Sequence, residues 1–338
     1  MEIWRKILET AVHAPSPHNV QPWRVKISDE RNAELYIDST RTLPKEDATG
    51  SFIILTMGMF LEALKILAAG DGFDLSYELF HEPDWYAPAI LETKLPTLLP
   101  FAKLNLSPSR EPTAPIYPPE LFFKRRTSRL SLSPQQITPP VIEDLTALAT
   151  LWQQRFEIVV EEKLIERLLK YNTEAVFTDL NAKDYHDEIV EWFRFSEKQS
   201  RRRLDGLDYR CMNTPRSTFW LSAHYSWLMK TPVLSSVLAK IYRRQTGTIP
   251  TVGLLSGKFW SPADAVETGK FLMRFWLETA RHNLYIHPFG NLVTNPQAAQ
   301  KVLDETGVSG VWLIFKIGYS TQPPKSYRLP VEKILVGE

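Results

Sequence analysis

Cysteine is nearly absent from this chain of 338 residues, in which Cys211 stands alone. A single cysteine excludes an internal disulfide and a cysteine-rich metal site, and a reducing compartment is then the expected environment. The chain also lacks an excess of charge of either sign, because 40 Lys and Arg residues balance 39 Asp and Glu residues. The net charge of +1 gives no global field that would recruit nucleic acid or an anionic membrane. We therefore expect neither partner, and any anion site must be local.

Uninterrupted hydrophobic runs and leader sequences are lacking as well. The most apolar early stretch, residues 51–72, contains Glu62 and Lys65, and we interpret it as an amphipathic helix and not as a membrane span. Residues 1–14 are amphipathic and charged, without the apolar core of a signal peptide. These features predict a cytoplasmic protein.

Several common catalytic motifs do not occur. We find no Gly-rich dinucleotide fingerprint after a strand, no phosphate-binding P-loop and no Gly-x-Ser-x-Gly elbow. The histidines show no i, i+4 metal-ligand pairing and no adjacent carboxylate constellation, so we expect no metal site and structural or surface roles, with His18 left open. The histidines are His13, His18, His81, His186, His224, His282 and His287. Cys211 has no Cys-x-x-Cys partner, and a packing role is expected for it.

The first part of the chain alternates between helical and extended patterns. Apolar spacing predicts helices over 3–13 and 50–69, and period-two alternation predicts strands over 23–27, 33–38 and 75–80. Residues 95–120 are dense in proline and poor in periodicity, so we interpret them as a connector between two halves.

The second part continues with a short basic segment, a helix, and strands over 155–162, 248–257 and 308–320. Residues 164–203 are predominantly helical, 204–247 have many aromatics in a broken pattern, and 321–338 form an extended tail. The best helix is 261–284, in which Ser261 is the expected N-cap, Pro262 the first position and Asp264 part of a capping box. Short strands with intervening helices predict an α/β or α+β layered fold.

Three segments carry polar groups that suit a ligand. Lys124, Arg125, Arg126 and Arg129 cluster around Thr127 and Ser128, which makes either a phosphate receptor or a solvated basic face. Lys325 and Arg328 lie in the proline-bounded tail. They would contribute to a phosphate site if they and the basic cluster at 124–129 converge on one phosphate. Gly290 either supplies a positive φ, lets a ligand approach the backbone, or belongs to an ordinary turn.

A loop near the start has unusual chemistry, and with these segments it points to a family. Residues 14–23, APSPHNVQPW, resemble the Pro-Ser-x-x-Asn-x-Gln-Pro-Trp signature of the nitroreductase family of FMN enzymes. RRTSR at 125–129 is similar to the family's phosphate-gripping segment, and PKSYRLP at 324–330 to its C-terminal Lys/Arg pair. NLYIHPFGN at 283–291 occupies the place of the glycine-containing turn near the flavin N5.

The order of these motifs resembles the Acg-type branch of the family, in which two nitroreductase-like halves are fused in one chain. The resemblance implies an α+β, three-layer α/β/α sandwich with halves 1–118 and 119–338, a lid-like insertion at about 196–246, and an internal pseudo-dimer that is a monomer or a homodimer. It implies one FMN site. Its residues would be Arg125, Thr127, Arg129, Lys325 and Arg328 at the phosphate end, Pro15, Ser16, Pro17, Asn19 and Gln21 at the ring, and Phe289 and Gly290 near N5.

The resemblance also implies a reaction. FMN would take a hydride from NAD(P)H and pass electrons to a nitro, quinone or other conjugated acceptor, with no catalytic side chain because the flavin performs the chemistry. The alternative is an FMN-binding or storage protein whose flavin is covered by residues 207–246. A third interpretation is a dehydrogenase that tailors a natural product, or a flavin-consuming enzyme. Trp23 is expected to be a core anchor.

Overall fold

The computed structural model describes residues 1–92, 97–110, 116–224, 237, 240–244 and 246–337. The chain forms two compact units. Unit 1 comprises Met1–Arg125, Phe259–Leu277 and Tyr327–Glu338, and unit 2 comprises Arg126–Lys258 and Glu278–Ser326. This division differs from the expected halves 1–118 and 119–338, because most of a late helix and the C-terminal tail pack within unit 1.

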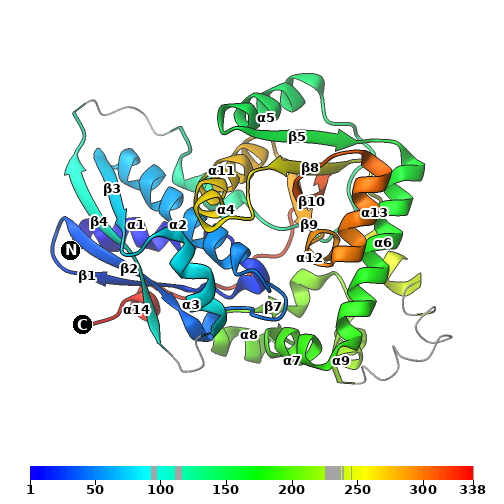
Figure 1. The fold of residues 1–338 in the computed structure, drawn as a ribbon, viewed down its shortest axis with the longest axis horizontal. Helices are drawn as coiled ribbons and strands as arrows, with labels where there is room; N and C mark the ends of the chain where they lie inside the picture. The colour runs from blue at the N-terminus through cyan, green and yellow to red at the C-terminus, as the bar shows by residue number, and fades with distance from the viewer. Residues whose placement is uncertain (93–96, 111–115, 225–236, 238–239, 245, 338) are drawn as a thin grey trace. The chain divides into compact units, whose positions relative to one another are not determined.

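Unit 1 is built on a four-stranded antiparallel sheet in the order β1-β2-β4-β3 (Figure 1). Its strands are β1 Trp23–Ile27, β2 Asn32–Asp38, β3 Phe73–Leu79 and β4 Leu98–Pro108. In β2 the buried residues Ala33, Leu35 and Ile37 alternate with more exposed ones, which is the period-two pattern of a half-buried strand. The strands expected at 23–27, 33–38 and 75–80 are confirmed.

The interpretation of residues 95–120 as a connector is wrong, because β4 is a central strand of this sheet. A bulge hides its pattern: Leu35 pairs with Ala102 and Tyr36 with Pro100, so Phe101 is an extra residue. Both Phe101 and Ala102 are buried, and this breaks the simple alternation. Pro100 lies at the bulge, where a missing N–H interrupts the ladder least.

Unit 2 contains a second four-stranded antiparallel sheet, in the order β5-β8-β10-β9. Its strands are β5 Gln154–Val159, β8 Val252–Gly257, β9 Tyr285–Pro288 and β10 Val311–Gly318. The strands expected at 155–162, 248–257 and 308–320 are confirmed in position, with shorter bounds. The four-residue β9 was not expected, since it is too short to show a periodicity. Antiparallel sheets with separate helices place the protein in the α+β class.

The two sheets repeat one topology. Counted along the chain within each sheet, both have the strand order first, second, fourth, third. A 20-residue helix joins the second strand to the third in each case, namely α2 Ser51–Gly70 and α11 Pro262–Arg281. A further helix precedes each first strand, namely α1 Glu2–Ala11 and α5 Pro139–Leu151. The repetition is one of topology, since the sequence shows no exact repeat.

Helix α2 is a core helix that is buried on nearly all sides, so the expectation of an amphipathic helix is wrong. It is long and apolar enough to cross a membrane, but 83% of its most apolar window is buried inside the protein. Its one buried charge, Glu62, accepts a 2.5 Å hydrogen bond from Arg274 Nε of α11. The apolar length of α2 is therefore used for packing within unit 1.

Two glycines allow α2 and α11 to touch backbone to backbone. A Cβ on Gly58 would lie 2.2 Å from the Val266 carbonyl oxygen, and a Cβ on Gly269 would lie 2.1 Å from the Leu55 carbonyl oxygen. Each glycine is the eighth residue of its helix, and each carbonyl belongs to the fifth residue. The contact is therefore reciprocal, like the self-complementary contact of a two-fold dimer. The N-terminus of α11 is capped as expected, with Asp264 N donating to Ser261 Oγ at 3.2 Å.

The remaining elements connect this framework. In unit 1 they are η1 Pro17–Asn19, η2 Ser39–Arg41, η3 Pro83–Trp85, α3 Tyr86–Glu92, α4 Pro119–Lys124 and α14 Val331–Ile334. In unit 2 they are α6 Glu162–Asn181, α7 Lys183–Glu191, β6 Phe193–Arg194, α8 Glu197–Arg203, β7 Leu207–Asp208, η4 Tyr209–Met212, α9 Arg216–His224, α12 Asn291–Thr294 and α13 Pro296–Thr306.

The segment expected to be a lid is only partly described. Its described portion packs into unit 2, where Phe219 and Ala223 of α9 join Ile189 and Phe193 in one buried cluster. Residues 225–236, 238, 239 and 245 lie outside the described part of the chain, so part of the lid expected at 207–246 falls on residues that the structure does not describe.

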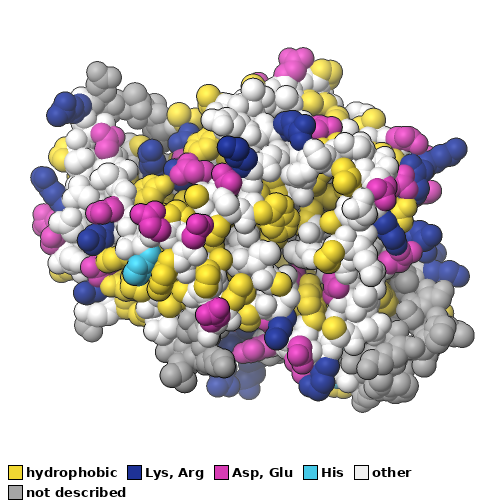
Figure 2. Space-filling model, viewed as in Figure 1, with side chains coloured by type: hydrophobic (Ala, Val, Ile, Leu, Met, Phe, Trp, Pro, Cys, Tyr) yellow, Lys and Arg dark blue, Asp and Glu magenta, His cyan; other side chains and the backbone are white. Residues whose placement is uncertain are grey.

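The surface carries charges of both signs without a dominant patch on the face in view. Figure 2 shows Lys and Arg side chains interspersed with Asp and Glu side chains over that face. This distribution agrees with the net charge of +1. Attraction of an anionic ligand must therefore come from a local group of cations.

Candidate functional site

The signature loop in unit 1 has a strained backbone. His18, Asn19 and Gln21 have φ values of 47°, 57° and 54°, a left-handed conformation that non-glycine residues seldom adopt. The Gln21 N–H donates to Ser16 Oγ at 3.0 Å, which closes the loop on itself. Trp23 follows at the start of β1, where it is fully buried and stacks on Phe60 at 4.6 Å. Its expected role as a core anchor is confirmed.

Two long-range hydrogen bonds tie this loop to the tail of the chain. Asn19 Nδ2 donates to the Tyr327 carbonyl at 3.1 Å, and the Leu329 N–H donates to Gln21 Oε1 at 2.8 Å. The Gln21 side chain is fully buried. These polar groups therefore hold the loop against the segment that carries Arg328. Arg328 and the loop, far apart in sequence, are brought together within unit 1.

Arg125 adds a second guanidinium to the same region. It is only 5% exposed, and its Nη2 donates to the His13 carbonyl, at the start of the loop, at 3.0 Å. Its guanidinium lies over the ring of Trp276 at 4.8 Å. Burial and the positive charge of Arg328 lower the pKa of Arg125 to about 9. Its Nε atom is buried without a hydrogen bond, and no acidic side chain is ion-paired with Arg125 in the described part of the chain. An anion would satisfy both the charge and the Nε donor.

The predicted binding residues divide between the two units. Pro15, Ser16, Pro17, Asn19, Gln21, Arg125 and Arg328 belong to unit 1, whereas Thr127, Arg129, Lys325, Phe289 and Gly290 belong to unit 2. Thr127 forms an isolated bridge with Ile286 of β9, and the Ser128 N–H donates to the Ile286 carbonyl at 3.0 Å. Thr127 and Ser128 therefore lie along the edge of the second sheet.

Arg129 is the centre of a basic group in unit 2. Its Nη1 donates to the Cys211 carbonyl at 3.2 Å, and burial lowers its pKa. Lys316 on β10 is fully buried, and burial with the nearby charge of Arg129 lowers its pKa to about 8. Its Nζ donates to the carbonyls of Leu130 and Thr246 at 2.7 and 3.1 Å. Burial, Arg129 and Lys316 also lower the pKa of His287 well below its usual value.

Lys316 and its neighbour His287 were missed by the sequence reasoning. A signal was present, because Lys316 is the one charge in the apolar run VWLIFKIG. A lysine in a strand buried on both faces needs polar partners inside the protein. The signal was overlooked because the run as a whole is typical of a core strand.

Three predicted residues behave differently from expectation. Gly290 has a φ of −54°, which removes the positive-φ alternative, and a Cβ at this position would meet open space. The Phe289 N–H already donates to the Ile314 carbonyl at 2.7 Å, and a donor used in this way is not free for a ligand. Lys325 is exposed. Cys211 is buried, with Sγ 3.5 Å from Ser326 Oγ, which agrees with a packing role.

The expectation that the histidines lack carboxylate partners is wrong. His18 Nε2 lies 2.8 Å from Glu46 Oε2, which answers the open question of its direction. His282 lies beside Glu278 and Asp144, and Glu278 precedes it by four residues. Spacing between pairs of histidines does not reveal this Glu-x-x-x-His pair.

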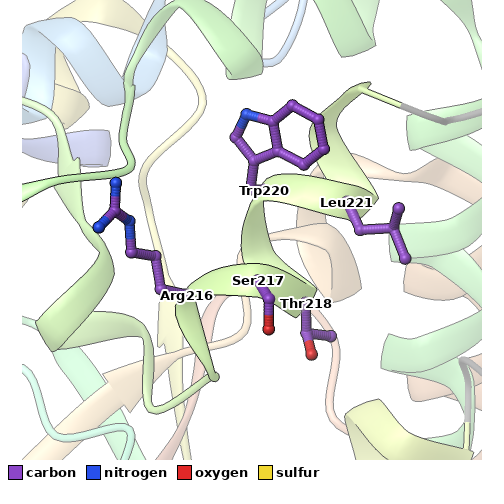
Figure 3. A pocket seen from close by; sticks show the side chains of 5 residues that line it. All are labelled: Arg216, Ser217, Thr218, Trp220 and Leu221. Carbon is purple, nitrogen blue, oxygen red and sulfur yellow. The ribbon is translucent and has the colours of Figure 1, made fainter.

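The described part of the chain also has an open pocket of about 850 Å³ on α9 (Figure 3). It is lined by Arg216, Ser217, Thr218, Trp220 and Leu221. None of these belongs to the predicted binding set. The pocket therefore adds no support to the predicted site.

Comparisons with known proteins give a consistent family. No family model matches the chain. A Mycobacterium tuberculosis protein named NAD(P)H nitroreductase acg is 26% identical over 199 residues, which cover 56% of this chain and 54% of that protein. The match thus spans about half the length of that relative. A Serratia protein named NAD(P)H nitroreductase PigM is 23% identical over 330 residues, which cover 93% of this chain and 88% of that protein.

A solved structure shares the fold over most of the chain. It is described as a nitroreductase from Anabaena variabilis, with a TM-score of 0.51 and 11% identity, and the match covers 94% of this chain and 88% of that one. At this identity the likeness shows the fold alone. Because both coverages are high, the fold likeness includes both four-stranded sheets.

Proposed function

The chain belongs to the nitroreductase family, and from this premise we propose that it is an FMN-dependent oxidoreductase. The names of the two curated relatives, both NAD(P)H nitroreductases, support NAD(P)H as the electron donor. The acceptor would be a small nitro, quinone or other conjugated molecule. We further propose a cytoplasmic location, in keeping with the single cysteine.

The observation that carries the proposal is the buried Arg125 beside Arg328, next to the signature loop. Burying a guanidinium near a second positive charge is costly unless an anion compensates it. An FMN phosphate carries about two negative charges and has three acceptor oxygens. Planar guanidinium forks suit such a group, because each can donate two parallel hydrogen bonds. The unsatisfied Nε of Arg125 fits this role.

Different residues of unit 1 would bind different parts of the cofactor. Arg125 and Arg328 would bind the phosphate, and the loop from Pro15 to Gln21 would form a rigid wall for the ring, because its side chains are already fixed by hydrogen bonds. Thr127, Arg129, Lys325, Phe289 and Gly290 remain predictions, each testable by its own variant. Bound FMN would supply the hydride and electron chemistry. The chain would bind and orient it.

We also propose that the chain arose by fusion of two nitroreductase-like halves. The shared strand order and the matching helices α2 and α11 support this origin. The reciprocal contact of Gly58 and Gly269 is what a former dimer contact would leave within one chain.

The first test is the absorbance spectrum of the purified protein after FMN is added and excess is removed. Retained flavin bands support the proposal, and loss of all FMN on a desalting column overturns it. The second test is anaerobic stopped-flow mixing of the FMN complex with NADPH and, separately, NADH. Rapid bleaching of the flavin band supports an oxidoreductase. A flavin that stays yellow with both donors overturns the enzyme proposal and favours storage.

A further inference from the structure

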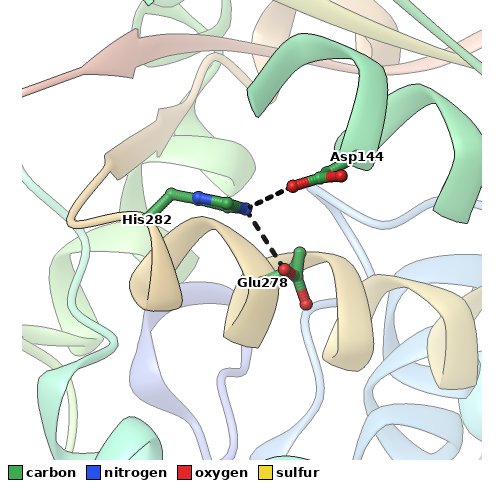
Figure 4. A group of neighbouring side chains, drawn as sticks. All are labelled: Asp144, Glu278 and His282. Atoms are coloured by element: carbon green, nitrogen blue, oxygen red, sulfur yellow. Dashed lines mark ion pairs between the residues drawn. The ribbon is translucent and has the colours of Figure 1, made fainter. Parts of the chain in front are cut away.

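A cluster of three potential metal ligands lies in unit 2, and none of the three is among the residues assigned to FMN. Asp144 projects from α5, Glu278 lies in the last turn of α11, and His282 follows that helix (Figure 4). Glu278 and His282 are four residues apart, so both side chains lie on one face of the chain at the helix end. Their ligand atoms and that of Asp144 all lie within 4.8 Å of one another.

We propose that Asp144, Glu278 and His282 bind a divalent first-row transition metal ion such as Zn²⁺. His282 Nε2 lies 3.2 Å from Asp144 Oδ2 and 3.2 Å from Glu278 Oε1. In a tetrahedral zinc site with ligands about 2.0–2.1 Å from the ion, neighbouring ligand atoms lie about 3.3 Å apart. The two separations from His282 match the edges of such a site, and the two carboxylate oxygens lie within 4.8 Å of one another.

The orientation of the imidazole supports a metal ligand more than a simple ion pair. The Nε2 atom is buried, and despite two carboxylate oxygens at 3.2 Å it makes a hydrogen bond to neither. An imidazolium held by a carboxylate is expected to align its N–H with one oxygen. A nitrogen directed between two carboxylates instead places its lone pair where a cation would sit. One imidazole and two carboxylates also form a ligand set that zinc accepts.

The surroundings allow an ion to enter and remain. Glu278 is 8% exposed, whereas the Asp144 side chain is 59% exposed, so one side of the cluster faces solvent. Three protein ligands leave a fourth position for water. Arg281 Nη1 lies 3.4 Å from Glu278 Oε1 and competes with a cation, but its side chain is 42% exposed and can turn away. Bound metal would link α5 to the end of α11.

The test uses the full-length protein stripped with a chelator, with Zn²⁺ as the probe in equilibrium dialysis at pH 7.5. We expect about one equivalent to bind to the parent. His282→Gln and Asp144→Asn should each weaken binding at least about tenfold, since each removes one ligand. Zinc should also raise the melting temperature of the parent and not of the variants, because ligand binding to the folded state stabilises it.

The matched control is His186→Gln. His186 Nδ1 also lies 3.5 Å from a carboxylate, that of Asp187, but no third ligand joins this pair among the residues that the structure describes, so zinc binding should be unchanged. Circular dichroism without metal checks that each variant is folded, and Asp144→Asn is the milder change because Asp144 is exposed. No uptake by the parent, or equal uptake by a folded His282→Gln, overturns the proposal and leaves the cluster as an ion pair.

Discussion

The two sheets share a strand order, but the connections around them differ greatly. Before the first strand of unit 1 lies the signature loop with its three left-handed residues, whereas before β5 only Trp152 and Gln153 follow α5. Between the first and second strands unit 1 has the short turn 28–31, and unit 2 has residues 160–251 with several helices.

This difference teaches where the two halves have specialised. The framework of sheet and long helix is common to both, and it fixes only the places at which connections begin and end. Of the groups with unusual chemistry, Arg125 lies in the connection after α4, Lys316 lies at a single position of β10, and Glu278 lies near the end of α11. Variants can separate the shared framework from the specialised groups.

The largest expected effect concerns the shared framework. Gly58→Ala and Gly269→Ala each place a Cβ within about 2 Å of a carbonyl oxygen, so the helices must separate. Each should lower the free energy of unfolding by at least about 2 kcal/mol, measured by urea denaturation. Gly290→Ala is the control, since it meets open space at a helical φ. If only one of the two variants lowered the free energy of unfolding, the inference that the contact is reciprocal would be contradicted.

The second prediction concerns the specialised part of unit 1. Arg125→Ala removes charged hydrogen bonds to phosphate and should weaken FMN binding by about 10- to 100-fold, or roughly 1.5–3 kcal/mol. Titration followed by flavin fluorescence measures the effect. Arg31→Ala, in the exposed turn between β1 and β2, should leave FMN affinity unchanged. If Arg129 contacts the FMN phosphate as predicted, Arg129→Ala in unit 2 should cause a similar loss of FMN affinity.

The third prediction concerns the buried lysine of unit 2. The pKa of Lys316 is about 8 in the folded protein and about 10.5 when exposed, so between these values the unfolded state binds more protons. The free energy of unfolding should therefore rise with pH over this window, by up to about 1 kcal/mol per pH unit. In Lys316→Met the contribution of this lysine to the rise of the unfolding free energy with pH should disappear. The exposed Lys301→Met serves as control, and an unchanged slope in Lys316→Met would contradict the shifted pKa.

The fourth prediction compares two left-handed glutamines, Gln21 and Gln153, each within two residues of the first strand of its sheet, and the smallest effect is expected at Gln153. Gln153 has a φ of 56° and is exposed, so Gln153→Gly should relieve strain and stabilise the fold by about 0.5 kcal/mol. Gln21→Gly should instead destabilise it by about 1–3 kcal/mol, because the buried Leu329 N–H loses its acceptor. Thermal denaturation of both variants measures the contrast. Stabilisation by both changes would show that the loop does not depend on the tail.

The sequence was sufficient for elements whose pattern is local. Period-two alternation located β2, and the capping box with Ser261 and Asp264 located the start of α11. It failed where a tertiary feature disturbed the pattern, as the bulge at Phe101 did in β4. It failed for α2 because a helix buried on all sides loses the contrast between its faces.

For the candidate site, the sequence supplied residue types but not their partners. Ser16, Asn19 and Gln21 were predicted as polar groups facing a ligand, whereas the structure shows how their side chains hold the loop and tail in place. Asp144 and His282 are far apart in sequence, so only the fold reveals that they meet. Long-range pairs of this kind leave no trace in local periodicity.

The attachment of the tail to the signature loop has a consequence for biosynthesis. Gln21 and Leu329 are separated by 308 positions, and ribosomes add about 5–20 residues per second. The loop is therefore made roughly 15–60 seconds before the residues that fasten it. Until the tail emerges, the left-handed conformations of His18, Asn19 and Gln21 lack the bonds from Tyr327 and Leu329. Cofactor binding at this loop should accordingly be one of the last events in the maturation of the chain.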